Sequence, residues 1–171
     1  MDQLFYYSKS KNVLPGLGIH EFINDISQYK PLCKINNFRQ ILSNFHKLPF
    51  IYNKLTYNSI EHAFQSEKIR LVDPDVAFKF SIESKDDISK GNGLNARQNR
   101  KIIHLDKKTI EHWNKVKMKI MNAITESKIK QCKIFRDTLL ATNNAQLWHI
   151  VIRQKPVRII YLEKLRDKYK K

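Results

Sequence analysis

The longest periodic segment of the sequence, residues 106–129, places the firmest constraint on the fold. Its apolar side chains recur at near-helical spacing, at Ile110, Trp113, Val116, Ile120 and Ile124. Such residues lie on one face of an α-helix, because an α-helix has about 3.6 residues per turn. We therefore predict a long amphipathic helix here, in a fold dominated by helices.

A tight hairpin and a capped helix are predicted before this segment. Two short apolar runs, 50–52 and 55–57, flank Asn53-Lys54, a two-residue connection that suits a hairpin because Asn tolerates positive φ. Ser59 is a good N-cap for a helix that we expect to run to about Val72. Asp73-Pro74 should close that helix and open the next one.

The remaining segments give shorter patterns. We expect strands at 4–7 and 146–152, helices at 130–141 and 157–169, a turn-rich loop at 11–18 and irregular structure up to about residue 38. The chain of 171 residues has the length of one ordinary domain. We predict a single compact, mainly α domain over residues 1–171, with a few short peripheral β-strands.

The charge of the chain points to an anionic partner. Lys and Arg number 32 against 16 acidic residues, which gives a formal net charge of +16. Such an excess favours nucleotides or nucleic acid as ligands. Part of it can also be mutational bias, because the chain is rich in Lys, Ile and Asn, as AT-rich genomes, viral ones included, encode.

Neither end of the chain has an apolar run typical of a signal peptide or a membrane span, so a cytoplasmic protein without a membrane partner is expected. The two cysteines, Cys33 and Cys132, stand singly, so we expect two reduced thiols in place of a disulfide or a metal site. Six histidines are scattered without zinc-ligand spacing, and we expect no metal and no cofactor.

Half of the excess charge falls in residues 85–133, which hold 13 basic and 5 acidic residues, a net charge of +8. Within this segment, residues 90–97 contain two glycines and two asparagines. Two interpretations stay open: a solvated, flexible loop, or a loop whose backbone N–H groups wrap a phosphate.

The helix predicted after Ser59 carries an unusual polar row. Glu61, Gln65 and Lys68 are spaced i, i+4 and i+7, so a carboxylate, an amide and an ammonium group share one face. This row can be an ordinary solvent-exposed surface. Alternatively, the carboxylate lies beside a cleft, where it can orient water or stabilise a sugar cation. Periodicity alone does not choose between these two.

Several stretches of the sequence resemble the NADAR, or YbiA-like, family in the same order. They are residues 5–8, 42–50 (LSNFHKLPF), the hairpin through Tyr57, 59–68 (SIEHAFQSEK), 113–121 (WNKVKMKIM) and 139–147 (LLATNNAQL). The resemblance covers nearly the whole chain and is weakest over residues 9–40 and 85–105.

The resemblance implies a mainly α-helical single domain that cleaves an N-glycosidic bond at the anomeric carbon of a ribose. The substrates implied are ADP-ribose attached to a nucleobase and ribosylamino-pyrimidine phosphates. The catalytic Glu of the family matches Glu61, its cleft Trp matches Trp113, and the Asn-Phe pair of its first motif matches Asn44 and Phe45. Gln65 and Lys68 match the remaining polar positions of the Glu helix.

The chemistry of such a cleavage suggests a role for each side chain. Glu61 can stabilise the C1′ cation and position a water. Asn44 can hold the leaving base or a ribose hydroxyl, and Lys68 can neutralise a phosphate or keep Glu61 ionised. Phe45, Phe64 or Trp113 can stack on the base. For Trp113, an indole buried in an ordinary core is the competing interpretation.

One family feature is missing from this sequence. Many members continue the Leu-Leu-x-Thr segment with an Asp and a Trp-Gly pair that help to form the active site, whereas residues 148–158 here contain neither. Trp148, His149 or Arg153 can occupy that corner in another way. Alternation along the expected strand puts Trp148 and His149 on opposite faces. We expect His149 to point toward Glu61 and assist the leaving base, against the alternative that Trp148 is core and His149 is exposed.

Two classes of function therefore remain. The first is an N-glycosidase that acts on an ADP-ribosylated nucleobase or a ribosylamino-pyrimidine phosphate. The second is a non-catalytic module that keeps the pocket and binds ADP-ribose or nucleic acid. The missing Asp-Trp pair favours the module, whereas Glu61, Gln65, Lys68 and Trp113 favour the enzyme.

Overall fold

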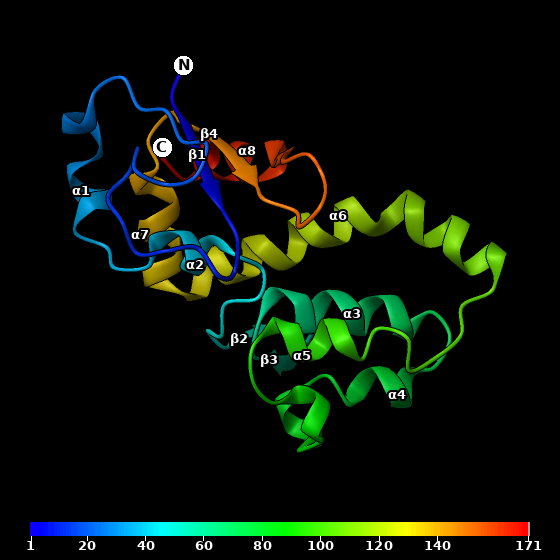
Figure 1. Cartoon of the computed structure of the whole chain (residues 1–171). Coiled ribbons are helices and arrows are strands. Elements are labelled where there is room, and N and C mark those ends of the chain that lie inside the picture. The colour runs from blue at the N-terminus through cyan, green and yellow to red at the C-terminus, as the bar shows by residue number, and fades with distance from the viewer. Residues whose placement is uncertain (171) are drawn as a thin grey trace. The chain divides into compact units, whose positions relative to one another are not determined.

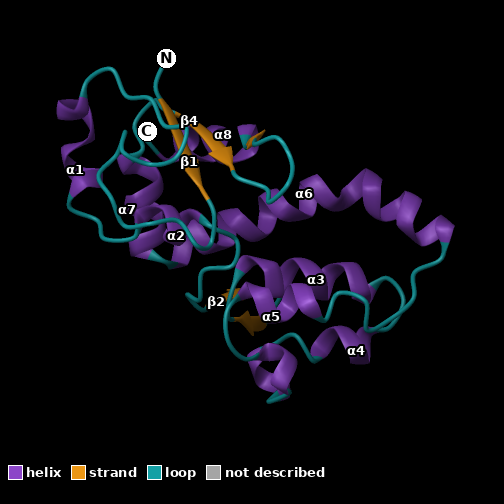
Figure 2. Cartoon of the chain, viewed as in Figure 1, coloured by secondary structure: helices purple, strands orange, loops and turns teal. Residues whose placement is uncertain are grey.

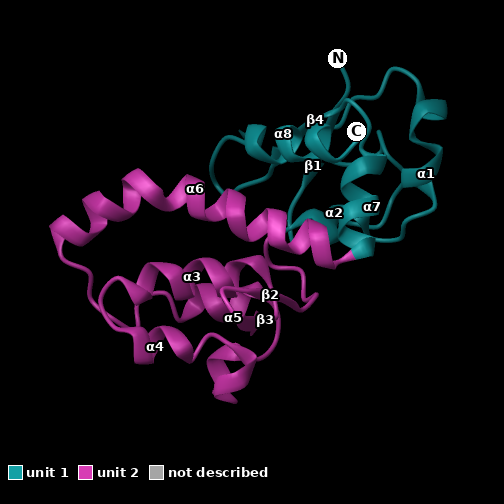
Figure 3. Ribbon diagram, turned by 180° about the vertical axis from the view of Figure 1, so that it is seen from behind, with its two compact units in different colours: residues 1–43, 133–171 teal, residues 44–132 magenta. Residues whose placement is uncertain are grey.

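The computed structural model describes residues 1–170 and confirms a mainly α-helical fold with few, short strands (Figures 1 and 2). The chain divides into two compact units, which Figure 3 colours separately. Residues 44–132 form the second unit as one continuous stretch, and the first unit combines residues 1–43 with 133–171.

The second unit begins with the hairpin and the helix that the sequence predicts. Strands β2 (Phe50–Tyr52) and β3 (Leu55–Tyr57) pair antiparallel, and Asn53 and Lys54 both have positive φ, at 48° and 68°. Two consecutive positive φ values define the type I′ turn, whose twist matches that of the strands. Helix α3 (Ile60–Arg70) follows, and the Ser59 side chain accepts a hydrogen bond from the backbone N–H of His62.

The rest of this unit packs around α3. Helices α4 (Pro74–Phe78), α5 (Gly93–Gln98) and α6 (Lys107–Gln131) all contact α3, and the short 3-10 helices η2 (Ile82–Ser84) and η3 (Asp87–Ser89) connect α4 to α5. The core includes Tyr57, Ile60, Ala63, Ile69, Ala77, Phe80, Ile124 and Ile129, all fully buried. The long predicted helix is confirmed as α6, with Asp106 as its N-cap.

Helix α5 corrects the flexible-loop interpretation of residues 90–97. The Asn92 side chain accepts a hydrogen bond from the Leu94 N–H and caps a helix over Gly93–Gln98. The two glycines and the asparagines conceal this helix, because glycine is a poor helix former in isolation. Packing against α3 explains why the helix forms, since tertiary contacts routinely override propensity.

The first unit is built around a small three-stranded sheet in the order β1-β4-β5. Strand β1 (Gln3–Tyr6) pairs parallel with β4 (Gln146–His149), and β4 pairs antiparallel with β5 (Val157–Arg158). Its helices are η1 (Ile26–Tyr29), α1 (Lys30–Cys33), α2 (Phe38–Leu42), α7 (Lys133–Ala141) and α8 (Ile160–Tyr169).

Three predicted boundaries in the C-terminal part were wrong. Helix α6 continues to Gln131, so α7 begins at Lys133 and not at Lys130. The expected strand over 146–152 ends at His149, although the Ile150 N–H still donates to the carbonyl of Tyr6 at 3.0 Å. Val157 and Arg158 belong to β5, and the last helix begins only at Ile160.

A buried ion pair, Arg39–Glu21, connects separate segments of the first unit. Arg39 and Glu21 are both buried, at 2.6 Å, and Arg39 also donates to the carbonyls of Val13 and Leu14. These bonds fix the loop at 11–18 to α2.

Both cysteines carry free thiols, with Cys33 half-buried and Cys132 buried. No helix within residues 1–170 is long and apolar enough to cross a bilayer.

Candidate functional site

The start of α3 brings the first-motif asparagine and the candidate catalytic carboxylate together. The backbone N–H of Glu61 donates to the carbonyl of Asn44 at 3.0 Å. The Asn44 side chain lies against the sulfur of Met121 on α6, with 3.9 Å from Nδ2 to Sδ. Two stretches that the sequence separates, residues 44–45 and the α3 helix, thus meet at one point.

Glu61 is buried, with only 5% of its surface exposed, which excludes the solvent-exposed interpretation of its polar row. Gln65 is equally buried, and its Nε2 donates to Glu61 Oε1 at 2.8 Å. Burial raises the pKa of the Glu61 carboxyl, because it penalises the charged form. The Gln65 hydrogen bond and nearby cations partly oppose that rise.

Gln65 has one unused hydrogen-bonding atom in this buried setting. Its Oε1 has no hydrogen-bond partner among residues 1–170. Buried polar atoms nearly always have a partner, so such an exception asks for an explanation. An amide oxygen next to the carboxylate is suited to accept a hydrogen bond from a ribose hydroxyl or from a base N–H group.

Helix α5 closes over Glu61 at a point where only glycine fits. The Gly93 N–H donates to the Phe45 carbonyl at 2.8 Å. A Cβ at Gly93 would lie 2.6 Å from Phe45 Cα and 2.9 Å from Glu61 Cβ, closer than real Cβ atoms approach their neighbours. The N-terminus of α5 therefore touches the backbone of the first motif and the side chain of the carboxylate.

Three cations lie near this carboxylate, and a fourth lies near one of them. Arg97, Arg100 and Lys68 lie near enough to Glu61 to favour its ionised form, and Lys117 on α6 lies near Lys68. Burial lowers the pKa of Lys68, and the positive charges of Arg100 and Lys117 lower it further, whereas Glu61 opposes them. The cations come from three helices, α3, α5 and α6, or from the residues directly after α5.

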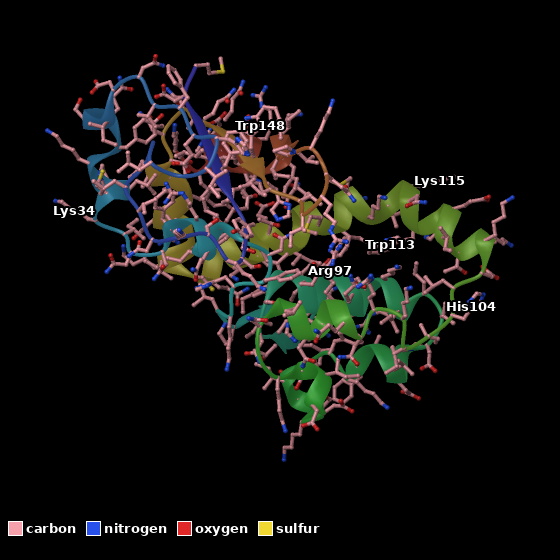
Figure 4. All side chains as sticks on the ribbon, viewed as in Figure 1. Lys34, Arg97, His104, Trp113, Lys115 and Trp148 are labelled. Carbon is pink, nitrogen blue, oxygen red and sulfur yellow. The ribbon has the colours of Figure 1, made fainter. Side chains whose placement is uncertain are left out.

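Two aromatic candidates form a pair beside this row. The rings of Phe64 and Trp113 lie 4.9 Å apart between centroids and are tilted by 55°. Trp113 is 5% exposed and Phe64 is half-buried. Figure 4 shows Trp113 on the side of α6 that faces α3, with Lys115 on the opposite side. Phe45 is half-buried and meets Gly93.

The structure thus brings seven of the eight predicted site residues into the second unit: Asn44, Phe45, Glu61, Phe64, Gln65, Lys68 and Trp113. His149 belongs to β4 of the first unit, where its ring lies 5.7 Å from that of Tyr6. Trp148 stacks on the buried Phe5 with 5.8 Å between ring centroids, and Trp148 and His149 are both half-buried. The role of His149 stays a prediction.

Three residues near Glu61 are absent from the predicted site residues: Gly93, Arg97 and Arg100. A signal was present, because Arg97 and Arg100 follow Gly93 at i+4 and i+7, the same spacing as the row on α3. The sequence does not reveal this signal, because its glycines and asparagines indicate a loop, in which helical spacing has no meaning.

His62 supports the site without facing it. It is fully buried, its Nδ1 lies 2.8 Å from Ser59 Oγ, and its Nε2 lies 3.1 Å from the carbonyl of Ile88. Burial lowers its pKa to about 4, so it is neutral, with Nε2 donating to Ile88 and Nδ1 accepting from Ser59. This bridge fixes η3, and with it the approach to α5. Among the described residues, no group of three or more His, Cys, Asp or Glu could hold a metal ion.

Comparisons with known proteins identify the family and the fold. The NADAR domain profile matches residues 22–154. The NMR structure of the E. coli protein YbiA has a similar fold, with a TM-score of 0.57 and 17% sequence identity. That match covers 99% of this chain and 87% of the YbiA chain. A comparison with curated proteins finds no significant relative.

Proposed function

The chain belongs to the NADAR domain family, and from that premise we propose that it is an N-glycosidase. Its substrate would be a phosphorylated N-riboside, either an ADP-ribosylated nucleobase or a ribosylamino-pyrimidine phosphate. The observation that carries this proposal is the buried Glu61, held by Gln65 and surrounded by cations.

Cleavage breaks the bond between C1′ and the base nitrogen, and the electron pair leaves with the base. The ribose then carries positive charge at C1′, which an adjacent carboxylate stabilises most strongly where water is excluded. A water oxygen attacks C1′ and transfers its proton to Glu61. Burial suits Glu61 to this task, because a raised pKa makes it a stronger base at the same position.

The neighbouring side chains have distinct tasks in this scheme. Gln65 orients the carboxylate through Nε2 and offers Oε1 to the sugar or the base. Lys68 keeps Glu61 ionised. Asn44 and the aromatic pair Phe64–Trp113 would hold the leaving base, and the departing nitrogen would take its proton from solvent.

The test is incubation with ADP-ribosylated DNA and with the ribosylamino-pyrimidine phosphate, followed by measurement of released base and sugar. Glu61→Gln should bind the substrate but lower the rate by about 10²-fold or more, the scale of a lost acid–base group. Circular dichroism would check that the variant is folded. Unchanged turnover in a folded Glu61→Gln protein would remove Glu61 from the mechanism.

A second function, a non-catalytic module that binds ADP-ribose or nucleic acid, is favoured by one observation. The segment after Leu139–Thr142 lacks the Asp and Trp-Gly residues that many family members carry. Binding of ADP-ribose by the wild-type chain, without release of base from either substrate, would support the module and exclude the enzyme.

A further inference from the structure

A cavity lies in the first unit at the ends of strands β1 and β4. Phe5 of β1 lines it, and so do Tyr7 and Ile150, which follow the ends of β1 and β4. The loop at 9–19 and Arg39 of α2 complete the lining. The volume is about 370 Å³, at the lower end of the range of about 300–1,000 Å³ for small-molecule pockets. The cavity shares no residue with the Glu61 site, because its whole lining belongs to the first unit.

Hydrogen bonds to one buried carboxylate fix the walls of this cavity. The Glu21 side chain is fully buried and accepts the N–H groups of Gly16 at 2.9 Å and Gly18 at 3.1 Å. It also accepts the Phe5 N–H at 3.2 Å and two guanidinium N–H groups of Arg39 at 2.7 and 2.6 Å. The protein itself therefore holds the loop to both β1 and α2. A preformed site of this kind loses little conformational entropy when a ligand binds.

The same hydrogen bonds restrict which anions the cavity can bind. An arginine fork and the backbone N–H groups of a turn are the groups that bind phosphate most readily. In this loop, Arg39, Gly16 and Gly18 direct those groups to Glu21 instead. A phosphate would have to displace the protein's own carboxylate, so the cavity favours an anion that does not need the arginine.

The surface left for a ligand is largely apolar. Val13, Leu17 and Ile19 come from the loop, and Phe5 and Ile150 come from the strand ends. Leu17 and Ile19 are 71% and 60% exposed, so two large apolar side chains at the cavity are in contact with water. The apolar body of a ligand would cover them and remove this surface from water, which favours binding.

Two cations line the same cavity without a counter-charge. Lys9 and Lys11 are exposed, and neither forms an ion pair with any residue from 1 to 170. None of the residues that line the cavity is acidic. The Tyr7 hydroxyl also has no hydrogen-bond partner within the described chain. Ammonium and hydroxyl groups beside an apolar wall are complementary to a compound with an apolar body and a carboxylate.

We propose that this cavity binds a small amphipathic carboxylate, with its apolar body against Leu17 and Ile19 and its carboxylate at Lys9 and Lys11. This is a second binding site of the chain, and it does not depend on hydrolysis at Glu61. The small volume suits a short acyl chain or a single ring. The two unpaired ammonium groups select an acid over the alcohol of the same chain length, and a titration can measure that preference.

Two-dimensional ¹H–¹⁵N NMR titration of the full chain with octanoate and with octan-1-ol tests the charge and the location together. At neutral pH and one ionic strength, we expect saturable shifts of amides in residues 5–19 and 150 with both compounds. Octanoate should bind about three- to tenfold more tightly, the scale of one or two exposed ion pairs. Equal affinity for acid and alcohol, no saturation with octanoate, or shifts confined to residues 44–132 would overturn the proposal.

Replacing Lys9 and Lys11 together by Gln tests the two cations. The double variant should bind octanoate about as weakly as octan-1-ol, and its affinity for octan-1-ol should be that of the wild type. Lys34→Gln is the matched control, because this exposed lysine directly follows α1, lies outside the lining and is labelled in Figure 4. It should change neither affinity. Wild-type affinity for octanoate in the folded double variant would overturn the proposal.

Leu17→Asp tests the apolar wall. Because Leu17 is 71% exposed, the change should preserve the fold, while it removes apolar contact and places a carboxylate that repels octanoate. We expect the affinity for octanoate to fall by about tenfold or more, the scale of one lost apolar side-chain contact. Ile26→Asp, at an exposed position of the same unit outside the lining, should leave it unchanged. Octanoate binding of wild-type strength in a folded Leu17→Asp protein would also overturn the proposal.

Discussion

At the scale of the residue, two opposing effects act on the pKa of the buried Glu61 carboxyl. Burial raises the pKa of its carboxyl, and a hydrogen bond from Gln65 and the surrounding cations lower it. The balance decides the pH at which the carboxylate becomes available as a base. In the proposed mechanism, the cations therefore affect turnover even where they do not touch the substrate.

Lys68→Gln should move the acidic limb of the pH–rate profile to higher pH, because a neighbouring cation favours the ionised carboxylate and its loss raises the pKa of Glu61. Turnover measured from pH 4 to 8 gives the midpoint of this limb. Lys115→Gln, on the exposed face of α6, should leave the midpoint in place. An unchanged midpoint of the acidic limb in Lys68→Gln would show that the lysine charge does not affect the pKa of Glu61.

The polar row on α3 could be predicted from the sequence, but its burial could not. Spacing alone places Glu61, Gln65 and Lys68 on one face, and charged residues on a helix face are mostly solvated. What buries them is α5, which begins more than twenty residues later in the chain and which local propensity does not indicate. Asn44 and Trp113 are expected near Glu61 only from the family resemblance, because helical periodicity does not predict contacts between separate elements.

At the scale of the element, α5 is a short helix that depends on one residue. Gly93 lets it approach the backbone of Phe45, and Asn92 caps it. Six residues form no stable helix in isolation, since nucleation costs more than such a length recovers. The helix forms because it packs against α3.

Gly93→Ala should destabilise the protein by about 1–3 kcal/mol, because the added methyl meets the Phe45 backbone and cannot be absorbed by a rotamer change. Denaturant unfolding measures this effect. Leu94→Ala, at an exposed position of the same helix, is the control and should change the stability little. A Gly93→Ala protein of wild-type stability would show that α5 can move without cost.

Elements with strong local signals were predicted well. Ser59 and Asp106 cap α3 and α6, and the Asn53-Lys54 turn makes the β2–β3 hairpin. Elements that form only through contacts with distant residues were not predicted. Strand β5 is two residues long and pairs only with β4, so it has no sequence pattern of its own.

At the scale of the whole molecule, the charge of +16 is unevenly compensated. Lys108, Lys115 and Lys119 are exposed on one face of α6, spaced i, i+7 and i+11, and form no ion pair with any residue of the described chain. The other end of the same helix pairs Lys130 with Glu126. An unpaired row of like charges suits a polyanion.

If this lysine face holds nucleic acid, replacing Lys108, Lys115 and Lys119 together by Gln should weaken binding of single-stranded DNA. It should also reduce the slope of log affinity against log salt by about 2, because each lost phosphate contact contributes about 0.7. Fluorescence anisotropy between low and moderate salt measures the slope. Hydrolysis of a small nucleotide substrate should depend little on salt and should be unchanged in this variant. The same slope for the variant and the wild type would mark these lysines as a solvated surface.

The parallel pairing of β1 with β4 has a consequence for the timing of synthesis. Gln3 and Gln146 stand opposite each other in the register, 143 residues apart in the chain. At a ribosomal rate of about 5–20 residues per second, β1 therefore waits roughly 7–30 s before its partner has even been translated. Residues 44–132 are complete well before then and form a continuous stretch, so the unit that holds Glu61 can fold during translation. The N-terminal strand meanwhile emerges with an unpaired edge, and the first unit can close only after β4 has been translated.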